Sequence, residues 1–235
     1  MPCLILAFLG YSTDPGLTGH TIYLPKEIPA DLKLPVLVWG NGACLSDGTS
    51  FDQALTEWAS HGFIVIANGE PGGSGQTTSK LLFQSIDFIT QNAGKGKHAN
   101  VDASRIAAAG QSCGGLEAYE TATDARVKAI GIFNSGEFSD SASRETIATL
   151  KQPGERDYKN LPSNIPSWKG NLDVGHMANW RETDGGKFAV SGTNWLKWLL
   201  RGDAQAAEWF TGNGAQQAGW QVEKKGLEGI QVIPI

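Results

Sequence analysis

The stretch 106–115 constrains the fold of this chain more than any other. It opens with small and apolar residues, as a short buried strand would, and continues as a G-x-S-x-G pattern at 110–114. A helix-compatible run, 116–122, follows at once. Strand, sharp turn and helix form the context in which this pattern lifts a serine hydroxyl above a sheet edge. We therefore predict that Ser112 is a nucleophile; the alternative is a Gly-Ser turn between two ordinary elements.

Length and charge narrow the class of protein. A chain of 235 residues fits one α/β domain spanning 1–235. The 19 Lys and Arg against 24 Asp and Glu give a net charge of −5, without a basic stripe for nucleic acid. No apolar run reaches the length of a membrane span. No metal-ligand cluster or cofactor fingerprint occurs, so we expect no cofactor, and no pattern specifies an oligomeric state.

The two ends of the chain are less defined than its middle. Residues 1–10 are apolar without a basic start, so they fit a poor signal peptide or an edge strand equally well, and we leave 1–18 open. The stretch 212–235 is polar and rich in glycine, which predicts a loosely held tail.

Between the ends, apolar strands alternate with amphipathic helices over short links. This alternation predicts a mostly parallel sheet flanked by helices. The expected strands are 19–25 at an edge, 34–39, 63–68, 106–109, 127–134 and 165–172, and the expected helices are 51–60, 77–91, 116–122, 144–150, 188–200 and 204–210.

His176 is the candidate base. It lies in a Gly-containing loop after the strand 165–172 and downstream of Ser112, the chain order of a Ser–acid–His triad. The alternative is a surface histidine. A second loop, 40–44, is rich in glycine and follows the buried strand 34–39, where backbone N–H groups can face a neighbouring site. It ends in Cys44, which either pairs with Cys113 or stays a buried thiol.

Three segments, 36–42, 110–115 and 170–176, carry a resemblance to the α/β-hydrolase superfamily. More closely, the chain is similar to fungal secreted hydrolases of the dienelactone-hydrolase and polyester-depolymerase-like group. The resemblance runs from about His20 to Phe210. It implies hydrolysis of a small or polymeric carboxylic ester through a serine acyl-enzyme, and it favours an extracellular location. It also implies an oxyanion hole formed by the backbone N–H groups of Cys113 and of Gly42 or Ala43.

The chain departs from this family where the catalytic acid belongs. The family has a further strand and an acid-bearing loop before the histidine strand, but 150–158 contains no apolar strand. On the order of fifteen residues, about a strand and its loop, are missing at 153–154. We therefore expect the sheet to lack one late strand.

Other carboxylates could replace the missing acid. Glu137 and Asp140 follow the strand 127–134, and Asp157 lies just past the gap; we favour Glu137 over Asp157. Asp173 is too close in sequence to orient the ring of His176. Two alternatives to an active esterase follow from the gap: a pseudoenzyme or binding protein that kept the scaffold, and an abnormal gene product that folds poorly.

Overall fold

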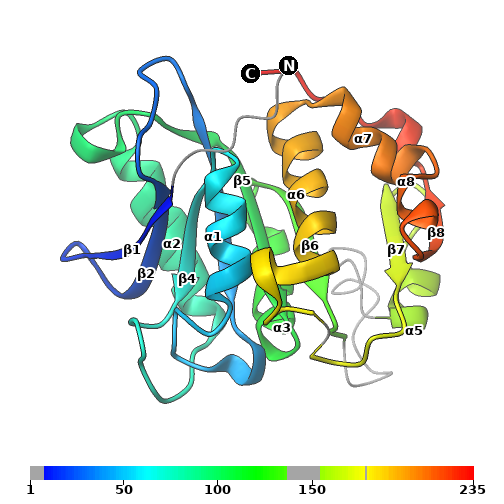
Figure 1. The fold of residues 1–235 in the computed structure, drawn as a ribbon, viewed down its shortest axis with the longest axis horizontal. Coiled ribbons are helices and arrows are strands. Elements are labelled where there is room, and N and C mark those ends of the chain that lie inside the picture. Colours follow the sequence, from blue (N-terminus) through cyan, green and yellow to red (C-terminus); the bar gives the residue numbers. More distant parts are fainter. Residues whose placement is uncertain (1–7, 137–153, 178) are drawn as a thin grey trace.

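The computed structural model describes residues 8–136, 154–177 and 179–235, and its centre is a six-stranded sheet (Figure 1). Its strands are β1 (Phe8–Asp14), β2 (Leu17–Pro25), β3 (Leu34–Gly40), β4 (Ile64–Asn68), β5 (Val101–Gln111) and β6 (Val127–Phe133). They lie in the order β1-β2-β4-β3-β5-β6. The last four are mutually parallel, whereas β1 and β2 are antiparallel to their neighbours.

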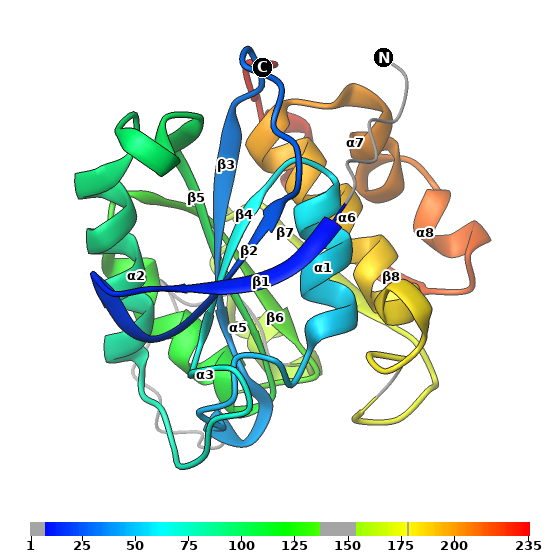
Figure 2. The same ribbon diagram turned by 60° about the vertical axis from the view of Figure 1, so that its left-hand side comes forward.

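Helices cover both faces of this sheet, as Figure 2 shows from the side. The helices of the described chain are α1 (Asp52–Ser60), α2 (Ser79–Asn92), α3 (Cys113–Glu120), α5 (Gly154–Asn160), α6 (Gly186–Arg201), α7 (Ala204–Thr211) and α8 (Gly214–Gln217). Helices α1 and α6 pack on one face, and α2 and α3 on the other. The predicted α/β fold with a mostly parallel sheet is therefore confirmed.

The alternation of side chains along the central strands creates two cores. In β3, Leu37 and Trp39 face the α1 and α6 side, whereas Val36 and Val38 face the α2 and α3 side. All four are fully buried, because helices cover both faces. This explains why the strand is a continuous apolar run in the sequence.

An aromatic cluster supports the carboxyl end of β3. The ring of Trp39 lies 5.3 Å from those of Phe51 and Trp58 and 5.7 Å from that of Trp180, measured between centroids. The indole N–H of Trp180 donates to Asn134 Oδ1 at 3.1 Å, just past the end of β6. The cluster therefore gives the strand ends that precede the candidate site a rigid base.

The late strands do not join the central sheet. Strand β7 (Ser167–Asn171) pairs antiparallel with β8 (Gln221–Lys225) in a separate two-stranded sheet. In the described part of the chain β6 pairs with β5 alone. A cavity of about 1180 Å³ separates β6 from β7, with aromatic walls that include Trp195 on α6 and Trp168 on β7.

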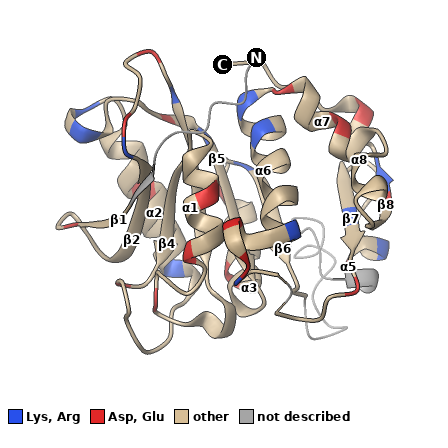
Figure 3. Ribbon diagram, in the orientation of Figure 1, with Lys and Arg blue, Asp and Glu red and all other residues tan. Residues whose placement is uncertain are grey.

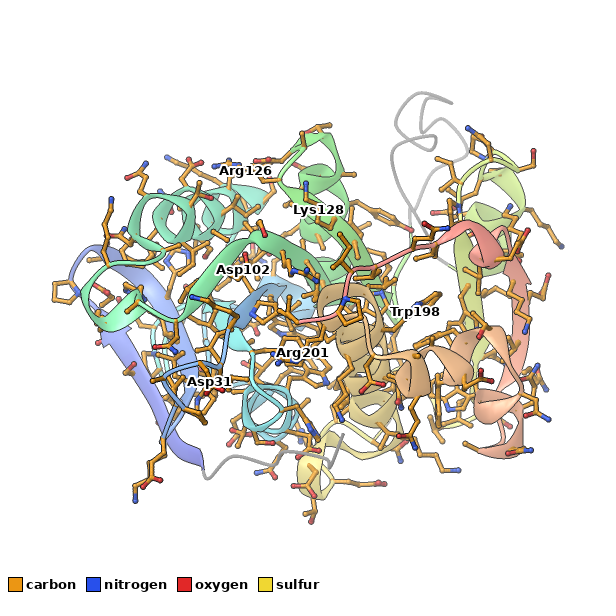
Figure 4. All side chains as sticks on the ribbon, turned by 90° about the horizontal axis from the view of Figure 1, so that it is seen from above. Asp31, Asp102, Arg126, Lys128, Trp198 and Arg201 are labelled. Atoms are coloured by element: carbon orange, nitrogen blue, oxygen red, sulfur yellow. A yellow bond between two sulfur atoms is a disulfide. The ribbon has the colours of Figure 1, made fainter. Side chains whose placement is uncertain are left out.

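Figure 4 shows the same region from above, with Trp198 on the side of α6 that faces β7 and β8. The ring of Trp198 stacks on Phe210 of α7, at 5.4 Å between centroids. This contact ties α6 to α7, which packs in turn against β7 through Phe210 and Trp168.

The described residues near both ends of the chain, 8–14 and 214–229, include regular elements. Strand β1 forms the sheet edge, so β2, expected at the edge, lies inside it. Beyond residue 212, α8 and β8 pack onto the fold, and Trp220 and Leu227 are buried. The apolar residues of this stretch are few, but Trp220 and Leu227 pack against other residues of the core. The helix expected over 144–150 lies outside the described residues.

Candidate active site

Ser112 occupies the turn between β5 and α3. Its backbone is in the left-handed region, with φ 51° and ψ −120°. Such a conformation costs a non-glycine residue of order 1–3 kcal/mol, so the surrounding structure must hold it. The Ser112 N–H donates to the carbonyl of Phe133 at 3.0 Å, and the Ser112 carbonyl accepts from Ser135 Oγ at 2.5 Å. Both bonds fasten the turn to the end of β6.

Three glycines make room for this turn. A Cβ at Gly114 would lie 2.1 Å from the carbonyl carbon and oxygen of Gly40, and one at Gly110 would lie 2.2 Å from the carbonyl oxygen of Gly114. Both distances are far below van der Waals contact. The first turn of α3 therefore packs directly on the ends of β3 and β5, and its positive end lies beside Ser112.

His176 reaches the serine from the loop after β7. Its Nε2 lies 3.0 Å from Ser112 Oγ, so a neutral ring can accept the hydroxyl proton. The imidazole is solvent-exposed. Its main chain is held by Gln111, whose Nε2 donates to the carbonyl of His176 at 3.1 Å. The structure thus brings together Ser112 and His176, the two residues predicted as nucleophile and base.

The loop after β3 lies next to the start of α3. Residues Gly42–Cys44 form a short 3₁₀ turn, in which Ala43 and Cys44 have φ values of 55° and 49°. A disulfide joins Cys44 to Cys113, with 5.1 Å between the Cα atoms. The sequence left this pairing open. The bond places Gly42 and Ala43 beside the residue after the candidate nucleophile.

The carboxylates considered for the role of the catalytic acid lie in different parts of the chain. Glu137 and Asp140 lie outside the described residues. Asp157 is buried on α5, and Asp173 is exposed in the loop of His176. Across 8–136, 154–177 and 179–235, no ion pair joins His176 to a carboxylate.

Sequence reasoning missed two side chains that support this arrangement. Gln111, 1% exposed, fills the x position of the motif and contacts the histidine loop. Glu117, 4% exposed, lies on α3 below the turn, and its carboxylate accepts from Thr77 Oγ1 at 2.6 Å and Asn68 Nδ2 at 2.8 Å. Burial raises its pKa, although these two hydrogen bonds oppose the rise. The sequence signal that could have identified Glu117 is a carboxylate on the buried side of a predicted helix.

Neither a metal-ligand group nor a membrane-spanning helix is found in the part of the chain that the structure describes. Acidic and basic residues are interspersed over the ribbon (Figure 3). Among the described residues, no three His, Cys, Asp or Glu side chains group as metal ligands would. No helix in the described ranges is both long and apolar enough to cross a bilayer.

The sheet, the strained serine turn and the facing histidine have the arrangement of an α/β-hydrolase fold. No family model matches the chain. Over 107 residues it is 31% identical to Cutinase 2 of Thermobifida cellulosilytica, a match that covers 43% of this chain and 37% of that protein. It is equally similar to Cutinase cut1 of Thermobifida fusca, of which 31% is covered. The match thus spans about a third of the length of these curated relatives. Both are bacterial, and they lend no support to the fungal and secreted character that the sequence resemblance implied.

Proposed function

We propose that this protein is a carboxylic ester hydrolase that works through a serine acyl-enzyme. The observation that carries the proposal is the 3.0 Å contact between Ser112 Oγ and His176 Nε2 at a strained strand–helix turn. The partial similarity to cutinases supports an ester as the substrate. The fungal dienelactone-hydrolase and polyester-depolymerase group remains the narrower suggestion of the sequence, with a small or polymeric ester as substrate.

In this mechanism Ser112 Oγ attacks the ester carbonyl carbon while His176 Nε2 takes the hydroxyl proton. The carbonyl π electrons move to oxygen, which the N–H groups of Cys113 and of Gly42 or Ala43 stabilise. The tetrahedral intermediate collapses, the C–O bond to the alcohol breaks, and His176 gives its proton to the leaving alkoxide. Water repeats the sequence on the acyl-enzyme and releases the acid.

A carboxylate is needed to hold the histidine tautomer and to stabilise the imidazolium. We retain Glu137 for this role, with Asp157 as the alternative; without such a group, turnover falls by about 10⁴ in a serine protease. A second candidate function is a binding protein that kept the scaffold. It is favoured by the exposed His176, which makes no ion pair with a carboxylate in the described part of the chain.

The test has two parts. In the first, the protein reacts with a fluorophosphonate probe and the adduct is mapped by mass spectrometry. In the second, the hydrolysis of p-nitrophenyl butyrate is measured. We expect an adduct on Ser112 that Ser112→Ala abolishes and His176→Ala slows strongly. Ser104→Ala is the matched control, because Ser104 lies near the amino end of β5 and Ser112 follows its carboxyl end. A cooperatively folded protein with neither adduct nor turnover would support the binding protein instead.

A further inference from the structure

Glu117 is a buried carboxylate with an unusual set of partners. It projects from α3, one turn after Cys113, and its two oxygens accept hydrogen bonds from Thr77 and Asn68. No cation pairs with it among the described residues. A buried charge without a cation is costly, because its hydration is only partly replaced. Stability alone therefore does not explain a carboxylate at this position.

Each hydrogen-bond donor to Glu117 also holds the loop after β3. The main-chain N–H of Thr77 donates to the carbonyl of Cys44 at 2.7 Å. The carbonyl of Asn68 accepts from Asn41 Nδ2 at 2.6 Å. Asn41 directly precedes the Gly42–Cys44 turn, and Cys44 is its last residue. The carboxylate is thus connected to both ends of this turn through one intermediate residue on each side.

The same side chain also contacts the strand that leads into the turn. A Cβ at Gly40 would lie 2.9 Å from Glu117 Oε2, so the carboxylate lies close against the last residue of β3. Asn41 strengthens this layer, since its Nδ2 also donates to the carbonyls of Leu45 and Asp47 at 2.9 and 3.0 Å. The polar layer below the turn is therefore buried, directional and continuous with α3.

We propose that Glu117 is a positioning residue, which through Thr77 and Asn68 fixes the Gly42–Cys44 turn against the nucleophile helix so that its N–H groups face the oxyanion. This inference rests on the proposed ester hydrolysis. The disulfide to Cys113 fixes one point of the turn, and the Glu117 layer fixes its two flanks. Oxyanion donors act only at the correct distance, and a displacement of about 1 Å can cost on the order of 10²-fold in rate.

Two substitutions at position 117 separate positioning from bulk packing. Glu117→Gln keeps an acceptor for Asn68, and its amide can donate to Thr77 Oγ1, whose proton then points to the Cys44 carbonyl 3.1 Å away. We expect it to keep kcat within about threefold. Glu117→Leu keeps the volume and loses both bonds, and we expect about 10²-fold lower kcat with little change in KM. Loss of oxyanion stabilisation lowers kcat without weakening ground-state binding.

Thr121→Val is the matched control for lost stability. Thr121 is fully buried at the end of the same helix, and its hydroxyl donates to the carbonyl of Ala118 at 2.7 Å, away from the turn. We expect its kcat to be that of the wild type even where its melting temperature falls as far as that of Glu117→Leu. A second pair, Thr77→Val and Thr77→Ser, repeats the comparison and decides the question if Glu117→Leu does not fold.

The outcomes are distinct. If the wild type turns over substrate and Glu117→Leu and Thr77→Val keep its kcat, the positioning role alone is overturned. The same holds if Thr121→Val loses as much kcat as Glu117→Leu does. A folded wild-type protein without turnover overturns the proposed function and this inference with it. Lower kcat in Glu117→Leu and Thr77→Val, with retention in Glu117→Gln and Thr77→Ser, supports it.

Discussion

Cys44 and Cys113 are joined by a disulfide that spans 69 residues of sequence and fastens the turn after β3 to the first residue of α3. Ser112 directly precedes the bonded Cys113, so the bond lies beside the candidate nucleophile. It links the two backbone segments to which the sequence resemblance assigned the oxyanion donors.

Reduction of this bond is expected to destabilise the protein substantially. Loop-closure entropy for a link of this length corresponds to about 4 kcal/mol of unfolding free energy. Urea denaturation with and without dithiothreitol measures it. Cys3→Ser is the control, because it leaves the bond intact, and its unfolding midpoint should respond to reductant as the wild type does. Identical midpoints with and without reductant in the wild type would contradict the expectation.

Gly114→Ala is expected to disrupt the serine turn. The added methyl would lie 2.1 Å from the carbonyl of Gly40, so β3 and α3 must move apart, and we expect a loss of at least about 2 kcal/mol with no labelling of Ser112. Gly229→Ala is the matched control, since no heavy atom lies within 4 Å of its added Cβ. Thermal unfolding and fluorophosphonate labelling of both variants give the answer. A Gly114→Ala protein as stable and reactive as Gly229→Ala would show that the close approach does not exist.

Gln111→Met is expected to slow the reaction of Ser112 without unfolding the protein. It keeps the length of the side chain and removes the donor to the carbonyl of His176. One such hydrogen bond is worth about 1 kcal/mol, so we expect about fivefold slower labelling. The control is Gln91→Met at an exposed position of α2. Equal labelling rates in the two variants would mean that Gln111 does not hold the histidine loop.

Local patterns were sufficient to predict the parts of this fold that depend on local chemistry. The apolar runs at 34–39 and 63–68 are buried strands because both faces of the sheet are covered. The glycines around Ser112 identify the turn because no other residue fits there. Motif and chain order singled out Ser112 and His176, and the structure places Ser112 Oγ and His176 Nε2 3.0 Å apart, although β7 lies outside the central sheet.

Other features depend on partners far away in the sequence. Gln111 and Glu117 acquire their roles from His176, Thr77 and Asn68, and no spacing rule connects these positions. The strand 221–225 escaped prediction because its residues are mostly polar and it forms only by pairing with β7. The gap at 153–154 predicts a missing strand, because the loss of an apolar segment is visible in the sequence itself, and among the described residues β6 pairs with β5 alone. Glu137 lies outside the described residues and stays a prediction.

The last prediction concerns how stability depends on pH. Burial raises the pKa of Glu117 above its ordinary value of 4.5, the hydrogen bonds from Thr77 and Asn68 oppose the rise, and the charge of Glu120 adds to it. Between the ordinary and the raised pKa, the folded protein holds a proton that the unfolded chain has released. The contribution of Glu117 to the free energy of unfolding therefore falls as the pH rises through this window.

Glu117→Gln removes this titration, because an amide carries no charge at any pH. We expect the melting temperature of the wild type, relative to that of Glu117→Gln, to decrease as the pH rises from about 4.5 through the raised pKa of Glu117, and then to level off. Glu120→Gln, at an exposed position on the same helix, removes the neighbouring charge and should make the decrease smaller. A wild-type melting temperature that rises relative to Glu117→Gln over this range would mean that the carboxylate is stabilised when ionised, so its pKa would be lowered. In that case the fold would gain stability from the charge below the Gly42–Cys44 turn.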